Sequence, residues 1–189
     1  MDEEISSGLD LFRYPESPLR RKFDPCVYSD PASFKPWLRV EFEFRCVYCL
    51  FREAWYPTGD QAFSVDHLAP KSRFPDRLTD YSNLVYACCH CNSAKRDMLD
   101  VPDPCLIAYG DHLEVVDGGE IQGLTPVGLD LIRICQLDRP RLTSFRRRMI
   151  GLFDQLAGAS SEQAAELRTR YFGPPVNAPD LSVLRPRRS

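Results

Sequence analysis

Residues 87–95 read ACCHCNSAK, and this short stretch decides how the middle of the chain folds. It places three cysteines, a histidine and an asparagine in five consecutive positions, from Cys88 to Asn92. Each of these side chains is able to ligate a metal ion or a substrate, but five neighbours cannot all point the same way. The residues that lie before this stretch indicate which of the five share a site.

A second pair of cysteines lies upstream, so the chain contains Cys46-x-x-Cys49 and Cys88-x-x-Cys91. Cysteines at i and i+3 around a tight turn can reach one ion, and four thiolates are a standard structural zinc site. A redox C-x-x-C needs one reactive pair in a thioredoxin-like setting, so two pairs favour zinc. The 38 residues between Cys49 and Cys88 exceed zinc-ribbon spacing and predict a structure of their own. Cys89 and His90 would then point outward, or serve as alternative ligands in another register.

Polar residues of a second kind surround these cysteines. REAWY (52–56) and QAFSVDHL (61–68) are predicted as two short strands, and the second ends in Asp66 and His67. Asn83 precedes the second cysteine pair and Asn92 follows it. A lone Asp-His pair is usually a surface turn, but the two asparagines in these places favour a site. Neighbours on a strand face opposite ways, so Asp66 and His67 need a turn or bulge to converge.

V-D-H-x-x-P (65–70) and N-L-x-x-x-C-x-x-C-N-x-x-K (83–95) together resemble the signature of HNH endonucleases of the four-cysteine zinc-knuckle type. The resemblance covers roughly residues 46–97. PASFKPWLRVEFEFRCVYC (31–49) is also similar to the lead-in helix of standalone bacterial members. The resemblance implies an α+β fold with a ββα-metal (His-Me finger) core clamped by zinc, an N-terminal helix and a C-terminal extension. Asn92 stands where the family name has its last histidine, as in many members.

The resemblance also implies a role for each polar residue. Phosphodiester hydrolysis needs a base that works near neutral pH, which suits His67. Asp66 and Asn92 offer the oxygen ligands that Mg²⁺ or Mn²⁺ prefers, and Asn83 would orient His67. The remaining implied residues are the four zinc ligands Cys46, Cys49, Cys88 and Cys91, and Lys95 as a phosphate contact. Lys71 and Arg73 either flank the substrate or are solvated loop charges.

The chain divides into four expected parts. Residues 1–31 have no clean periodicity and predict an extended or loosely packed arm, and residues 32–104 form the nuclease core. Residues 105–173 predict a β-meander followed by helices, which begin at the Thr125-Pro126 cap, near Pro140 and at SSEQ (160–163). Residues 174–189 are a basic tail. Three isolated cysteines are expected to be ordinary buried residues: Cys26, Cys105 and Cys135.

The net charge is −3, which argues mildly against indiscriminate binding to nucleic acid. Residues 124–150, however, contain six arginines and two aspartates, a local charge of +4. The arginines of residues 139–148 form the solvated face of an amphipathic helix, the commoner case, or bind phosphate. The apolar stripe of that helix packs on the core or forms a homo-oligomer; it consists of Leu142, Phe145, Met149, Leu152, Phe153 and Leu156.

The N-terminus, MDEEISSGLDLF, lacks the layout of a signal peptide, and the chain contains no apolar run of 18 residues. We therefore expect a cytoplasmic protein without a membrane span. The expected function is metal-dependent hydrolysis of DNA, ahead of RNA. The resemblance also implies a phage-defence or restriction context, with a partner ATPase or sensor subunit that controls the cut. The alternatives are a catalytically silent, zinc-stabilised nucleic-acid-binding module and a zinc-based protein-interaction module.

Overall fold

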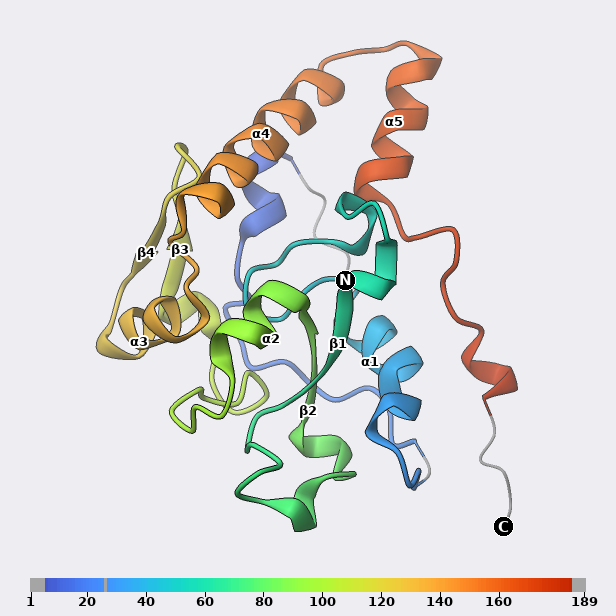
Figure 1. Cartoon of the computed structure of the whole chain (residues 1–189). Helices are drawn as coiled ribbons and strands as arrows, with labels where there is room; N and C mark the ends of the chain where they lie inside the picture. The colour runs from blue at the N-terminus through green and yellow to red at the C-terminus, as the bar shows by residue number, and fades with distance from the viewer. Residues whose placement is uncertain (1–5, 26, 185–189) are drawn as a thin grey trace.

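The structure is a computed structural model that describes residues 6–25 and 27–184. Its centre is the antiparallel hairpin of β1 (Phe63–His67) and β2 (Leu84–Cys88), followed at once by α2 (Cys89–Lys95) (Figure 1). Every residue of β2 is buried, as its apolar LVYAC sequence favours. The register runs without interruption from Phe63 opposite Cys88 to His67 opposite Leu84. The expected α+β class with a ββα core is confirmed.

The segment before β1 is not the strand that was predicted for residues 52–56. It forms a 3-10 helix, Glu53–Trp55, and a second 3-10 helix follows at Gly59–Ala62. The Glu53 carboxylate is buried and accepts two hydrogen bonds from the Arg39 guanidinium, at 2.9 and 2.8 Å, and one from the Tyr86 hydroxyl at 2.6 Å. This buried ion pair anchors residues 53–55. Their backbone makes the local hydrogen bonds of a 3-10 helix, not the hydrogen bonds between strands of a sheet.

The lead-in helix is present as α1 (Lys35–Glu41), preceded by a 3-10 helix, Pro31–Phe34. The Asp30 side chain accepts a hydrogen bond from the Ala32 amide at 3.1 Å, which confirms the predicted cap. Pro36 lies in the first turn of α1, where its missing N–H costs no hydrogen bond. Leu38 is buried, and α1 packs against both strands of the hairpin.

The N-terminal segment is packed rather than loose. Residues 8–12 form a 3-10 helix, and Leu11, Phe12 and Tyr14 are all buried. The Gly8 amide donates to the Asp154 carboxylate at 2.6 Å, and a Cβ on Gly8 would lie only 2.3 Å from the Ile150 carbonyl oxygen. The expectation of a loosely packed arm is therefore wrong for residues 8–14. Its 3-10 and extended backbone has no helical or strand periodicity for a sequence pattern to reveal.

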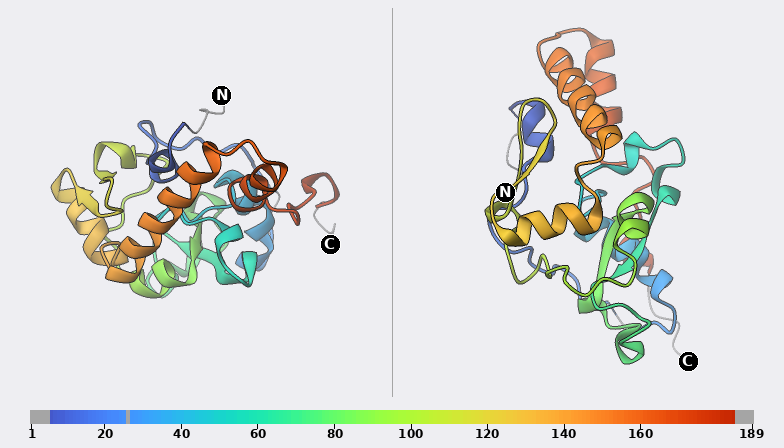
Figure 2. Two further views of the ribbon diagram at one scale, coloured as in Figure 1. Left: turned by 90° about the horizontal axis from the view of Figure 1, so that it is seen from above. Right: turned by 60° about the vertical axis from the view of Figure 1, so that its left-hand side comes forward.

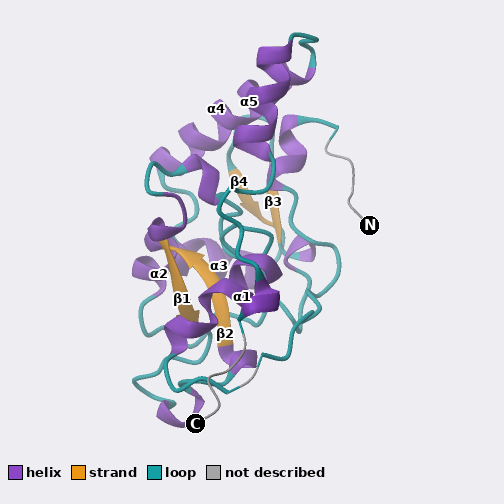
Figure 3. Cartoon of the chain, turned by 90° about the vertical axis from the view of Figure 1, so that its right-hand side faces the viewer, coloured by secondary structure: helices purple, strands orange, loops and turns teal. Residues whose placement is uncertain are grey.

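The C-terminal half begins with a hairpin of β3 (Leu113–Val115) and β4 (Ile121–Gly123), which replaces the predicted meander. Figure 3 shows this hairpin as a pair of strands separate from β1 and β2. Three helices follow: α3 (Pro126–Cys135), α4 (Pro140–Ala157) and α5 (Glu162–Phe172). The Thr125 and Ser161 caps are confirmed, since their hydroxyls accept from backbone amides at 3.3 and 3.2 Å.

The apolar stripe of α4 packs within the chain. Its buried members face the 3-10 helix at residues 8–12 and the helix α5, which runs back alongside α4 (Figure 2). Those members are Leu142, Met149, Phe153 and Leu156. Of the two alternatives for this stripe, the structure thus shows packing on the core. None of the helices in residues 6–25 and 27–184 is long and apolar enough to cross a lipid bilayer.

The isolated cysteines differ in their surroundings. Cys135 is buried, as predicted, whereas Cys105 is only partly buried. Cys26 and the last five residues of the basic tail lie outside the described residues.

Arg146 is a fully buried arginine, not a surface charge. Its guanidinium donates to the Gly119 carbonyl at 2.9 Å and to the Leu137 carbonyl. Gly119 lies in the β3–β4 turn and Leu137 follows α3, so one side chain joins three elements of the C-terminal half. The neighbouring Arg147 is exposed and pairs with Glu120 at 3.1 Å.

Arg146→Ala is expected to lower the free energy of unfolding by about 3 kcal/mol, because two carbonyls lose their donor and a buried side chain leaves a void. Arg147→Ala, the matched control, should change it by less than about 1 kcal/mol. Urea denaturation of both variants measures the difference. Equal effects would show that Arg146 does not join these elements.

Candidate active site

The four paired cysteines meet at one point. The Sγ atoms of Cys46, Cys49, Cys88 and Cys91 all lie within 4.8 Å of one another, and all four residues are buried. The Leu50 amide donates to the Cys46 carbonyl at 2.9 Å and closes the first turn. The Val47 amide donates to the Tyr86 carbonyl at 3.0 Å and attaches this turn to β2. The second pair lies at the junction of β2 and α2.

This cluster fits a structural zinc ion. The Cys49 and Cys88 sulfurs are 3.7 Å apart. A tetrahedral ion with Zn–S bonds of 2.3 Å would place its sulfurs about 3.8 Å apart. Without an ion, hydrogen bonds within the cluster lower the pKa of the Cys88 thiol, whereas burial and the same hydrogen bonds raise the pKa values of the Cys49 and Cys91 thiols. A bound cation would favour the thiolate form of all four. Cys89 and His90 are exposed and lie outside the cluster.

His67 lies at the end of β1 with one ring nitrogen already engaged. Its Nε2 is 2.9 Å from the Leu78 carbonyl oxygen. A carbonyl only accepts hydrogen bonds, so Nε2 carries the hydrogen in this contact. The neutral ring therefore has an unprotonated Nδ1, which is free to accept a proton. Leu78 belongs to the long loop between β1 and β2.

Asn83 fixes that loop. It is fully buried, and its Oδ1 accepts from the Ala69 amide at 2.7 Å. Its Nδ2 donates to the Ala69 carbonyl at 3.1 Å and to the Arg77 carbonyl at 3.2 Å. Arg77 precedes Leu78, so Asn83 holds the backbone whose carbonyl binds His67. The structure thus places Asn83 where it can orient His67 through the loop.

Asp66, which precedes His67 on β1, is buried and only 5% exposed. Its carboxylate accepts from the Tyr48 hydroxyl at 2.7 Å and from the Lys95 ammonium at 3.3 Å. Burial raises the pKa of the Asp66 carboxyl, and Lys95 and Tyr48 oppose that shift. The Lys95 ammonium also donates to the His67 carbonyl at 2.7 Å. Lys95 is fully buried, so it joins α2 to β1 and does not occupy the surface position expected for a phosphate contact.

Asp66, His67 and Asn92 line one cavity of about 520 Å³. Asn92 projects from α2, and its Nδ2 donates to the Ser64 hydroxyl at 2.7 Å. Asp66 and His67 reach this cavity without the expected bulge, because all five residues of β1 line it. Of the two expected flanking cations, Lys71 lines the cavity, whereas Arg73 is exposed elsewhere on the loop.

Several residues of this cavity were not predicted from the sequence, among them Ser64 and Arg96. Ser64 contacts Asn92, and its place two residues before Asp66 on a strand was a signal for a shared face. Arg96 follows α2 with a positive φ of 49°, which turns the chain sharply and leaves the arginine at the cavity. A positive φ on a residue other than glycine is uncommon and has no signature in the sequence.

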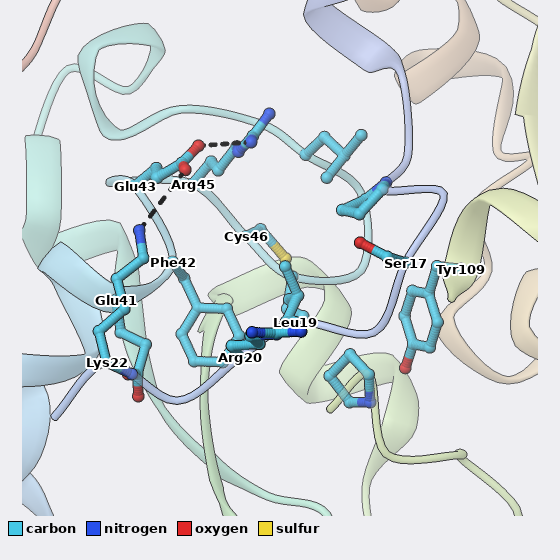
Figure 4. A pocket seen from close by; sticks show the side chains of 14 residues that line it. Ser17, Leu19, Arg20, Lys22, Glu41, Phe42, Glu43, Arg45, Cys46 and Tyr109 are labelled. Atoms are coloured by element: carbon cyan, nitrogen blue, oxygen red, sulfur yellow. Dashed lines mark hydrogen bonds and ion pairs between the residues drawn. The ribbon is translucent and has the colours of Figure 1, made fainter. Parts of the chain in front are cut away.

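A smaller cavity of about 160 Å³ borders the first cysteine turn (Figure 4). Phe42, Leu19 and Tyr109 form part of its wall, and Cys46 lies at its base. Its lining holds three cations and two carboxylates, a net charge of +1, and Glu43 pairs with both Arg45 and Lys22. This cavity therefore offers little net charge to a phosphate group, and it contains none of the predicted catalytic residues.

Comparison with known proteins agrees with this geometry. Residues 46–98 match the family described as HNH endonuclease. The chain is also similar to the Septu protein PtuB of Bacillus thuringiensis, with 28% identity over 117 residues. That alignment covers 56% of this chain and 44% of the relative, so the chain spans less than half the length of the curated protein it matches. The segment that matches the HNH endonuclease family, from Cys46 to Met98, is the one that contains the cysteine cluster and the ββα hairpin.

Proposed function

We propose that this chain is a metal-dependent endonuclease that hydrolyses phosphodiester bonds in DNA, with His67 as the general base. One observation carries the proposal. His67 has an engaged Nε2 and an unprotonated Nδ1, and it shares a cavity with Asp66 and Asn92. An imidazole base beside oxygen ligands for a divalent cation is what phosphodiester hydrolysis requires.

His67 would take the proton of the attacking water on Nδ1. The Leu78 carbonyl then stabilises the imidazolium, because its hydrogen bond to Nε2–H strengthens when the ring becomes charged. Asn83 keeps that carbonyl in place through the loop backbone. A positioned general base of this kind contributes a rate factor of about 10²–10⁴.

Asp66 and Asn92 would hold Mg²⁺ or Mn²⁺. A carboxylate and an amide oxygen at one cavity suit these ions, and the Asn92 nitrogen already bonds Ser64, which leaves its oxygen for a ligand. When bound, the ion supplies positive charge to the phosphate and to the leaving oxygen. The buried Lys95 ammonium pairs with the Asp66 carboxylate at 3.3 Å, which offsets part of its charge and restricts its movement. Lys71 lies where it can meet a substrate phosphate.

The wider context is part of the same proposal. We propose DNA, ahead of RNA, as the substrate. The proposed setting is phage defence or restriction in the cytoplasm, with a partner ATPase or sensor subunit. The match of residues 46–98 to a nuclease family supports cleavage more than it supports a silent binding module. The presence of Asp66, His67 and Asn92 around one cavity supports the same choice.

Purified protein incubated with supercoiled plasmid and Mg²⁺ or Mn²⁺ should nick or linearise it. His67→Ala should lower the rate at least about 100-fold, because the base is removed. His112→Ala, which removes a histidine of the C-terminal half, is the matched control and should retain activity. Residual cleavage that is equal in the parent and in His67→Ala would contradict the role of His67.

Asn92→Ala is expected to raise the Mg²⁺ concentration for half-maximal cleavage at least about tenfold, because one of two protein ligands is lost. Ser93→Ala alters the exposed neighbour on α2 and should leave the metal dependence unchanged. A titration of cleavage rate against Mg²⁺ measures both. An unchanged midpoint in Asn92→Ala would remove it from the metal site.

Removing zinc should unfold the core, since the two cysteine pairs lose the ion that joins them. Cys46→Ser should therefore lower the melting temperature and abolish cleavage. Cys89→Ser, at the exposed cysteine beside the cluster, should do neither. Circular dichroism and the zinc content of each variant provide the measurement. A Cys46→Ser protein with full zinc and a normal melting temperature would contradict the assignment.

A further inference from the structure

The arginines of residues 124–150 are not equivalent in the structure. Four of them are engaged: Arg133 with Asp130, Arg139 with Gln136, Arg146 inside the core and Arg147 with Glu120. Within the described part of the chain, Arg141 and Arg148 have no acidic partner. They lie seven residues apart on α4, two turns along one face. Two exposed guanidiniums therefore remain available on the same side of this helix.

Both of these arginines line a cavity of about 440 Å³. Ser144 and Phe145 lie between them, so the spacing 141, 144, 145 and 148 presents one stripe of α4 to the cavity. The opposite wall holds Trp55, Tyr56 and His90. None of the described residues that line this cavity is acidic. It is thus both aromatic and positively charged, unlike the small cavity beside Cys46.

The aromatic wall is held in place. The Phe145 ring lies 4.9 Å from the Phe51 ring, and the Arg148 guanidinium lies 5.5 Å from the Phe145 centroid. The Trp55 Nε1 donates to the Tyr171 carbonyl at 2.8 Å. Phe145 and Tyr56 are only partly buried, so they present ring surface to the cavity. Fixed rings beside a guanidinium plane are the surfaces on which nucleobases stack.

This cavity adjoins the candidate active site. The Tyr56 ring contacts the Phe63 ring, with centroids 5.2 Å apart, and Phe63 begins the strand that ends at His67. Phe63 itself lines the active-site cavity. His90 and Asn92 belong to the same short helix, α2, above which α4 lies in Figure 1. The two cavities thus lie on either side of the Tyr56–Phe63 ring pair, close enough for one substrate strand to reach both.

We propose that this cavity binds an unpaired base of the substrate strand, a few nucleotides from the scissile phosphate. The base stacks on Tyr56, Phe145 and the Arg148 guanidinium, while Arg141 and Arg148 neutralise the flanking phosphates. The proposal rests on the proposed nuclease function, and it specifies the substrate as one with a single-stranded region. The absence of acidic lining residues and the two unpaired arginines favour a nucleic acid over a peptide.

Binding of a fluorescent 20-nucleotide oligo-dT strand, with a 20-base-pair duplex alongside, tests this in a His67→Ala background that does not cleave. Arg141→Ala combined with Arg148→Ala should weaken single-strand binding about tenfold or more. It should also reduce the salt slope by about 1.4, as expected for two lost phosphate contacts. The matched control, Arg133→Ala with Arg147→Ala, removes the same charge from two paired arginines and should leave binding nearly unchanged.

A 2-aminopurine placed in the strand reports on stacking. Its fluorescence should be quenched on binding and should recover in Phe145→Leu, which keeps an apolar side chain against Phe51. Equal losses in the two double variants, or equal losses for strand and duplex, would overturn the base site. If the parent cleaves, and the Arg141, Arg148 and Phe145 variants bind and cleave as well as the parent, the base site is disproved and the proposed nuclease function is retained. If the pocket variants lose binding but the parent never cleaves, the nuclease fails and the base site stands.

Discussion

The four sulfur atoms of Cys46, Cys49, Cys88 and Cys91 join the turn before β1 to the junction of β2 and α2. Between them lies the whole loop that contains β1, so the cluster closes a segment of 38 residues. Four thiolates in a buried cluster need a cation that offsets their charge, and a zinc ion would supply it. Because Asn92 follows Cys91 directly, an ion held by the cysteines would also set where α2 presents its asparagine. The cavity of Asp66, His67 and Asn92 thus depends on a cysteine cluster that does not line it.

Buried polar contacts then fix the hairpin within that frame. Lys95 reaches from α2 to the Asp66 carboxylate and the His67 carbonyl, and Asn83 ties the two sides of the following loop. Each contact removes freedom from one of the residues that the proposed reaction uses. Breaking a buried ion pair on one side leaves an uncompensated charge, so such contacts also tie the fold to one arrangement. The surface of the cavity is left to groups that can meet a substrate.

Much of this centre could be predicted from sequence because its information is local. The cysteine spacing, the Asp66-His67 pair and the asparagines on either side of the second knuckle all lie in short motifs. The structure brings three of those polar residues to one cavity. Helix caps such as Thr125 and Ser161 are equally local, and they were found where expected. The role of each residue in catalysis stays a prediction.

The features that sequence reasoning missed depend on contacts between distant segments. Glu53 begins a 3-10 helix in place of the predicted strand, because its carboxylate is buried in an ion pair with Arg39, fourteen residues earlier. The N-terminal segment is buried because α4, far along the chain, packs against it, with the Ile150 backbone directly beside Gly8. Lys95 and Arg146 look like surface cations in the sequence, and only the tertiary fold supplies the acceptors that bury them. The same fold separates the two free arginines of α4 from their paired neighbours.

The central claim is that the cysteine cluster holds one metal ion on which the hairpin and its cavity depend. X-ray absorption at the zinc edge of the purified full-length protein measures this most directly. The account predicts one zinc per chain, surrounded by four sulfur atoms at about 2.3 Å. A protein that is folded without bound metal, or a zinc ion with nitrogen or oxygen ligands in place of any of the four sulfurs, would contradict it.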